Sequence, residues 1–90
     1  MFKTLEELIA VIRKRKGSSV EESYTSKLLN NKKLSVEKVK EEIAELINAI
    51  EKNTNKTHEA ADVVYHLLVL LSMKGVHIDD LLSELENRRN

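Results

Sequence analysis

The sequence of 90 residues contains no cysteine, no proline and no tryptophan, and only two glycines. Without cysteine, the chain can form neither a disulfide nor a thiolate metal site. The absence of proline, together with abundant Leu, Ile, Glu, Lys and Ala, favours an all-helical domain. Long apolar runs are also missing. The longest, 63–71, is interrupted by His66 and is far shorter than the ~20 residues that a membrane-spanning helix needs.

Neither sign of charge is in excess, because 15 basic residues balance 15 acidic ones. Bulk charge therefore predicts neither a nucleic-acid nor a membrane partner. The N-terminus lacks the basic stretch and apolar run of a secretory signal, so we expect a soluble cytoplasmic protein. Residues 1–90 are expected to form one domain. A domain of this size buries only about 60% of its unfolded surface, and an all-round apolar helix at 59–71 then indicates a homodimer.

Apolar residues recur at helical spacing in four segments, at about residues 4–16, 36–52, 57–74 and 79–88. A shorter element begins near Ser19, which forms a candidate capping box with Glu22. We expect Ser35 to cap the helix that follows it and Gly75 to end the most apolar helix. The polar stretch 53–57 between the two longest helices is short, which predicts an antiparallel hairpin.

The most apolar helix carries two acids. Glu59 and Asp62 are three positions apart, so they share one face of the helix, and His66 joins them four positions after Asp62. The rest of this helix is apolar all round and is expected to be buried. Carboxylates on a buried helix are costly unless a cation or another partner meets them.

A second acidic pair, Glu42 and Glu45, lies on the preceding helix. Helical geometry places Glu42 at the border of the core and Glu45 further out on the same flank. Folding the hairpin about residue 54 puts the two acidic pairs at similar heights on adjacent helices. The apolar stripe of the preceding helix is expected to be in the core: Val36, Val39, Ile43, Leu46, Ile47 and Ile50.

Taken alone, glutamates on a helix fit a solvated face. Facing the acids of the next helix, they predict a metal site. Four carboxylates without cysteine or paired histidines suit a hard cation, Mg²⁺ or Mn²⁺, and Mg²⁺ is commonly completed by substrate phosphates. Such a site implies phosphate-ester chemistry.

Other residues are weaker candidates. Glu41 and His66 are the nearest groups for a general base, although His66 is more simply a core-edge histidine that hydrogen-bonds an acid or a backbone carbonyl. Arg13 begins a basic cluster that suits a helix C-terminus, or else forms an anion-attracting rim for a phosphorylated ligand. The hydroxyl-rich segment 23–29 fits an ordinary short helix as well as a binding segment.

The spacing Glu42-x-x-Glu45 followed by Glu59-x-x-Asp62 resembles the signature of the all-α nucleoside triphosphate pyrophosphohydrolases, the MazG-like and dimeric dUTPase superfamily. The segments at 4–8, 21–29 and 59–71 are most similar to one branch, the phosphoribosyl-ATP pyrophosphohydrolases of histidine biosynthesis. The Ser-Tyr-Thr-x-Lys-Leu and Tyr-His-Leu-Leu-Val-Leu-Leu blocks make the resemblance specific. It covers essentially the whole chain.

The resemblance implies an all-α homodimer with a four-helix-bundle-like core that hydrolyses phosphoribosyl-ATP to phosphoribosyl-AMP and pyrophosphate. Glu42, Glu45, Glu59 and Asp62 would hold Mg²⁺ against the triphosphate. Substrate contacts would come from the segment Ser23, Tyr24, Thr25 and Lys27, and Arg13 and His66 are further candidates for substrate binding. Some relatives are fused to the cyclohydrolase of the next step. This chain has no room for it, so a separate phosphoribosyl-AMP cyclohydrolase is expected.

The chain departs from the family at Lys40, where relatives often have glycine, and in its Asn- and Thr-rich connection after Lys52. Neither change touches the acids. Two alternative functions stay open. A general MazG-like house-cleaning pyrophosphohydrolase would share the four acids, although the 23–29 segment argues against it. A non-catalytic dimeric interaction module would give no reason to place acids on the most apolar helix.

Overall fold

The computed structural model describes residues 3–16 and 23–89, and this part of the chain forms helices and no strand. The all-α prediction is confirmed. The helices expected at about 4–16, 57–74 and 79–88 agree with the observed helices to within one residue at each end. The helices are α1 (Lys3–Arg15), α2 (Tyr24–Leu29), α3 (Lys32–Lys52), α4 (Lys56–Met73) and α5 (Ile78–Asn87).

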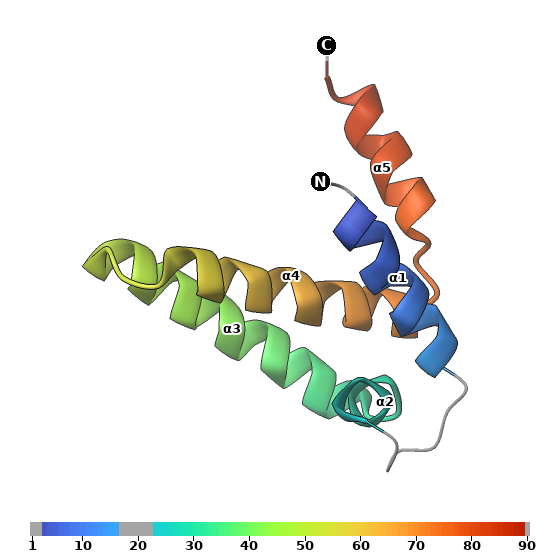
Figure 1. Cartoon of the computed structure of the whole chain (residues 1–90), viewed down its shortest axis with the longest axis horizontal. Coiled ribbons are helices and arrows are strands. Elements are labelled where there is room, and N and C mark those ends of the chain that lie inside the picture. Colours follow the sequence, from blue (N-terminus) through green and yellow to red (C-terminus); the bar gives the residue numbers. More distant parts are fainter. Residues whose placement is uncertain (1–2, 17–22, 90) are drawn as a thin grey trace.

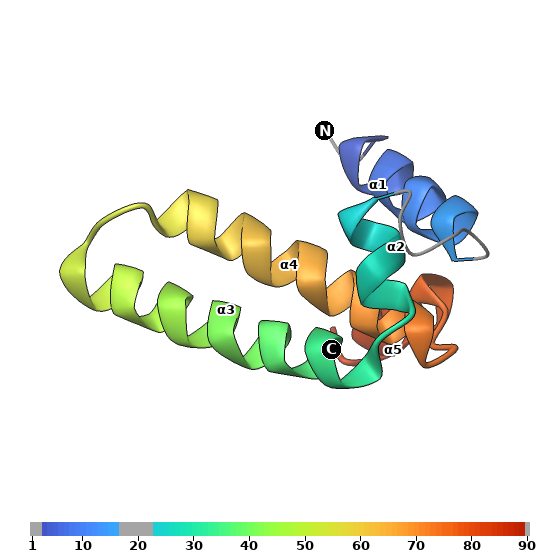
Figure 2. The same cartoon turned by 90° about the horizontal axis from the view of Figure 1, so that it is seen from below.

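The two longest helices, α3 and α4, form the predicted antiparallel hairpin and lie side by side along the molecule (Figures 1 and 2). The turn between them is tight because two of its residues have left-handed backbone, Asn53 at φ 55° and Asn55 at φ 42°. Asparagine adopts this conformation more readily than most residues. The side chains of the turn therefore allow the hairpin to close within three residues.

The start of α3 differs from the sequence-based expectation. Asn31, not Ser35, caps the helix, and its side-chain oxygen accepts a hydrogen bond from the Leu34 amide at 3.0 Å. Ser35 lies inside the helix and is buried. Asparagine is as good a cap as serine, and Lys32 and Lys33 are good helix formers, so the helix gains a turn that the apolar pattern did not reveal.

The short helix α2 begins with its own cap. The Ser23 hydroxyl accepts a hydrogen bond from the Ser26 amide at 3.0 Å. The capping box expected at Ser19 and Glu22 lies outside the described residues. Thr25, Ser26 and Leu28 are buried, so α2 is a wedge between α1 and the α3–α4 hairpin.

The main core lies where α1, α2 and the second half of α4 meet. Its buried apolar side chains are Ile12, Leu28, Leu29, Leu68, Val69 and Ile78. No single helix in the described residues is long and apolar enough to cross a membrane. Only α4 and α5 together pass that test, and their axes differ by 111°. Figure 1 shows α5 projecting from the end of α4.

The far half of the hairpin has an apolar surface that the chain itself leaves open. α3 meets α4 through a face that includes Glu42 and Ala49, whereas Ile47 and Ile50 are 53% and 56% exposed. The expectation that the whole apolar stripe of α3 is in the core was therefore wrong for this chain alone. We call the exposed surface the isoleucine ridge: Ile43, Ile47 and Ile50 of α3, with Val64 and Leu67 of α4.

Gly75 ends α4 as predicted, with φ +76°, and its amide donates a hydrogen bond to the Ser72 carbonyl at 3.1 Å. A Cβ added there meets nothing within 4 Å. The position therefore needs glycine for its backbone conformation and not for space.

We predict that Gly75→Ala lowers the free energy of unfolding by about 1 kcal/mol, the usual cost of a left-handed alanine. Chemical denaturation should show this loss, and Lys74→Ala is the control because Lys74 has an ordinary φ of -90°. Equal stability of Gly75→Ala and the parent chain would contradict the assigned role.

Candidate active site

The two acidic pairs meet across the hairpin. One carboxylate oxygen from each of Glu42, Glu45 and Glu59 lies within 4.8 Å of the others. Asp62 is close enough for its negative charge to act on Glu42. The structure therefore brings together all four acids of the predicted site. We call Glu42, Glu45, Glu59 and Asp62 the carboxylate cluster.

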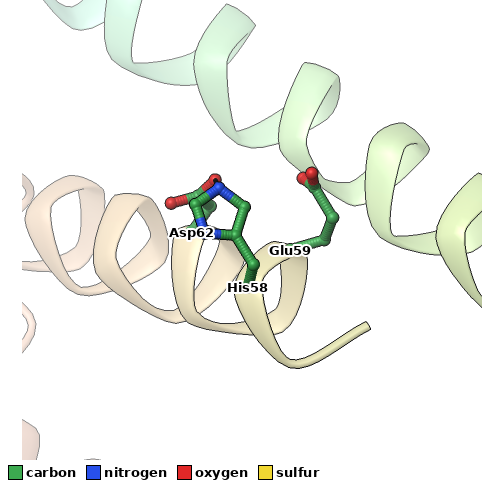
Figure 3. A group of neighbouring side chains, drawn as sticks. All are labelled: His58, Glu59 and Asp62. Atoms are coloured by element: carbon green, nitrogen blue, oxygen red, sulfur yellow. Dashed lines mark ion pairs between the residues drawn. The ribbon is translucent and has the colours of Figure 1, made fainter. Parts of the chain in front are cut away.

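A histidine that the sequence reasoning missed extends the cluster. His58 Nε2 lies 3.4 Å from Asp62 Oδ2, and His58, Glu59 and Asp62 also form a group whose ligand atoms lie within 4.8 Å. Figure 3 shows the His58 ring beside Asp62, while Glu59 points toward α3. The signal was present in the sequence, since His58 and Asp62 are four positions apart on one helix.

Two oxygens of the cluster fit a metal in their chemistry. Glu42 Oε2 and Glu59 Oε2 are buried without any hydrogen-bond partner in the structure. A buried carboxylate oxygen without a donor costs free energy unless a proton or a cation meets it. The two residues come from adjacent helices and belong to the same group of possible ligands. The donor set consists of carboxylate oxygens and one imidazole nitrogen, and it suits Mg²⁺ or Mn²⁺.

Glu42 lies at the centre of this electrostatic arrangement. It is only 8% exposed, on the face of α3 that meets α4. Burial raises the pKa of its carboxyl, and the neighbouring Glu45 and Asp62 carboxylates raise it further, while His66 acts in the opposite direction. The prediction that Glu42 borders the core and Glu45 lies further out is confirmed, since Glu45 is exposed.

His66 is buried and both of its ring nitrogens have partners. Nδ1 lies 2.8 Å from the Asp62 carbonyl oxygen, and Nε2 lies 3.0 Å from the Tyr24 hydroxyl. A carbonyl oxygen only accepts, so Nδ1 donates to it, and in the neutral tautomer this leaves Nε2 as the acceptor for the Tyr24 hydroxyl. The interpretation of His66 as a core-edge histidine bonded to a backbone carbonyl therefore agrees with the structure, and a role as general base does not suit it.

The side chains of the hydroxyl-rich segment on α2 make hydrogen bonds to other groups of the protein. Ser23 caps α2 and its hydroxyl lies 3.1 Å from that of Ser26. Thr25 Oγ1 hydrogen-bonds the Tyr65 hydroxyl, and the rings of Tyr24 and Tyr65 stack with centroids 6.4 Å apart. These contacts fasten α2 to α4 beside the cluster. Ser23, Tyr24 and Thr25, which the sequence predicts to contact the substrate, therefore also have a structural role.

Lys38 was not among the predicted site residues; the sequence suggested only that it pairs with Glu42, four positions on. Its Nζ lies 3.5 Å from Glu41 Oε2, one helical turn before Glu42. The Glu41 carboxylate and then the Tyr24 phenol raise the pKa of Lys38, so the ammonium is charged. Glu41 itself is exposed and belongs to neither group of possible metal ligands.

Two predicted residues lie elsewhere. Lys27 is exposed on α2. Arg13 of α1 lines one cavity of about 150 Å³ together with Lys16 and His77, and another of about 370 Å³ between α1 and α5. Neither cavity includes a member of the carboxylate cluster. Within one chain, the structure therefore does not bring Arg13 to the cluster.

A family model described as Phosphoribosyl-ATP pyrophosphohydrolase matches residues 5–89. The match spans all five helices and every member of the carboxylate cluster. It therefore covers far more than the acidic signature.

Curated relatives have related names. A phosphoribosyl-ATP pyrophosphatase of Haloarcula marismortui is 49% identical over 90 aligned residues, which cover 94% of this chain and 92% of the relative. One of Rhodobacter capsulatus is 42% identical, covering 93% and 84%. The histidine biosynthesis bifunctional protein HisIE of Pyrococcus furiosus is 41% identical over 94% of this chain and 41% of its own length.

The raised pKa of Glu42 predicts a pH-dependent stability without metal. Between the ordinary glutamate pKa and the raised one, the folded chain keeps a proton that the unfolded chain has lost. Stability therefore falls as the pH rises through this window. Glu42→Gln, which imitates the protonated form, should raise the melting temperature by a few degrees at about pH 8 in a chelator, with a smaller gain at about pH 4.

The control is Glu51→Gln, because Glu51 is an exposed glutamate of α3 outside the cluster. It should change the melting temperature little at either pH. A lower melting temperature of Glu42→Gln at about pH 8 would contradict the assigned cost of the buried charge.

Proposed function

This chain belongs to the phosphoribosyl-ATP pyrophosphohydrolase family, and we propose that it hydrolyses phosphoribosyl-ATP to phosphoribosyl-AMP and pyrophosphate. Water cleaves the α–β phosphoanhydride in this reaction, the second step of histidine biosynthesis. The observation that carries the proposal is the carboxylate cluster with its two buried, unpartnered oxygens. A surface acidic patch would not leave such oxygens buried.

We propose Mg²⁺ as the cofactor, with Glu42, Glu45, Glu59 and Asp62 as its protein ligands. When bound, Mg²⁺ would neutralise charge on the phosphates and lower the pKa of a bound water. The hairpin positions the ligands. Glu42 and Glu45 lie on α3, Glu59 and Asp62 lie on α4, and the packing of the two helices fixes the distance between the two pairs. His58 is an additional possible ligand, because it shares a group with Glu59 and Asp62.

Among the side chains near the cluster, Glu41 suits a general base better than His66 does. Its carboxylate is exposed and lies outside the ligand groups, whereas both nitrogens of His66 are occupied. A base must reach the attacking water with a free lone pair. The substrate contacts predicted for Ser23, Tyr24, Thr25, Lys27 and Arg13 are kept as proposals.

We further propose that the protein is a homodimer in which the isoleucine ridge is covered by a second copy. The ridge is contiguous along two packed helices, and its Ile47 and Ile50 are more than half exposed. An exposed apolar surface of this kind marks an interaction site. Two hairpins joined through it would make the four-helix core that the resemblance implies.

The cytoplasmic location and a separate cyclohydrolase for the product are predictions that rest on the resemblance. The bifunctional relative of Pyrococcus furiosus fits a link between two steps of one pathway. A coupled assay in which a phosphoribosyl-AMP cyclohydrolase consumes the product would test the identity of that product.

The function is tested by pyrophosphate release from phosphoribosyl-ATP with and without Mg²⁺. We predict that Glu59→Gln and Asp62→Asn each lower kcat at least ~100-fold while the chain stays helical, because each removes a charged ligand. Mg²⁺ should raise the melting temperature of the parent chain and not that of the variants. Glu51→Gln is the control and should keep full activity.

A panel of free nucleoside triphosphates tests the alternative. Higher kcat/KM on the panel than on phosphoribosyl-ATP would favour the house-cleaning function. Unchanged turnover in both cluster variants would exclude the assigned site, and absence of any Mg²⁺ effect would favour the non-catalytic interaction module.

The dimer is tested by adding one charge to the ridge. Ile47→Lys should convert the dimer to a monomer. The free energy needed to bury an unpaired charge in the interface exceeds the stabilisation that most subunit contacts provide. Asn48→Lys adds the same charge to an exposed neighbour outside the ridge and should stay dimeric. Sedimentation of both variants decides the point, and a monomeric parent chain would overturn the proposal.

A further inference from the structure

Lys38 stands out among the basic residues of α3 by its surroundings. Its side chain is 31% exposed, and its ammonium lies beside Glu41 at 3.5 Å. Tyr24, on another helix, and Glu42, in the cluster, also act on its charge. Lys40, two residues on, pairs with Glu37 at 3.9 Å and has a side chain that is 71% exposed. The two lysines therefore have the same kind of ion pair, but Lys38 lies four positions before Glu42, on the same face of α3 as this member of the cluster.

The direction of the hydrogen bonds decides what Tyr24 can offer. His66 Nδ1 donates a hydrogen bond to the Asp62 carbonyl, and in the neutral imidazole this leaves Nε2 to accept a hydrogen bond from the Tyr24 hydroxyl. The Tyr24 oxygen is then left with lone pairs, which attract an ammonium and repel an ionised phosphate. At this edge of the cluster, Lys38 is the group suited to meet a phosphate oxygen.

The charges of the substrate make such a group necessary. A triphosphate brings several negative charges to a cluster that already holds four carboxylates. A single Mg²⁺ supplies only two positive charges, so a further cation near the cluster lowers the repulsion. Lysine serves phosphate as a point charge on a flexible stem, and it can leave a weak exposed partner such as Glu41 for a stronger one.

We propose that Lys38 is a substrate-contacting residue that binds a phosphate oxygen of the substrate at the edge of the carboxylate cluster. Glu41 holds its ammonium there before the substrate arrives, and His66 fixes the orientation of the nearby Tyr24 hydroxyl. This inference rests on the proposed function and adds a phosphate contact to it.

The test compares Lys38→Met with Lys40→Met, two substitutions that remove the same charge and the same kind of ion pair from one helix. Lys38→Met should lower kcat/KM for phosphoribosyl-ATP about tenfold or more, mainly through a higher KM. Lys40→Met should stay within about twofold of the parent chain. Lys38→Arg should recover part of the loss, because it restores the charge but not the geometry.

Salt provides a second readout that a purely structural role would not change. The KM of the parent chain should rise with ionic strength, and the rise should be smaller in Lys38→Met, because one charge contact is gone. Thermal melting and the Mg²⁺-induced shift in melting temperature should match those of the parent chain. If Lys38→Met does not fold, Lys38→Gln takes its place.

The outcomes separate this inference from the one it rests on. A parent chain that releases no pyrophosphate from phosphoribosyl-ATP overturns the proposed function. An active parent chain with equal kinetics for Lys38→Met and Lys40→Met overturns the role of Lys38 alone. Loss of kcat with unchanged KM and unchanged salt dependence would also overturn it, because a phosphate contact acts on binding.

Discussion

The packing of α3 against α4 places acids opposite each other across the hairpin. Apolar side chains at these positions would pack without cost, but Glu42 and Glu59 each leave a buried oxygen without a partner. Repulsion between neighbouring carboxylates adds to this cost and raises the pKa of Glu42. The packing of α3 against α4 is therefore least favourable in free energy at the carboxylate cluster, where a cation would bind. A bound cation would make the contacts between these carboxylates stabilising.

The stability needed to hold such a site comes from elsewhere. The buried apolar cluster lies at the junction of α1, α2 and the second half of α4, away from the turn of the hairpin. Toward the turn, the hairpin has few apolar contacts of its own, and the isoleucine ridge is open. A second copy covering the ridge would support the half of the hairpin that carries the acids. On this account, dimerisation and metal binding depend on each other.

The sequence predicted the helices and the meeting of the acidic pairs, because both follow from local spacing and a short turn. The start of α3 was missed, since a cap at Asn31 leaves no apolar signal. The exposure of Ile47 could not be foreseen, because an apolar stripe is the same whether it meets its own chain or another. The contact between His66 and Tyr24 required the position of α2, which periodicity does not give.

The position of α2 gives its hydroxyl-bearing residues a structural role beside the carboxylate cluster. Tyr24 reaches His66, and His66 reaches the carbonyl of Asp62, so three hydrogen-bonding groups link α2 to the turn of α4 that bears a cluster acid. Thr25 adds a parallel link through Tyr65. A segment that resembles a substrate-binding block therefore also supports the ligand set. Substitutions in α2 should be interpreted as changes to the geometry of the cluster before they are interpreted as lost substrate contacts.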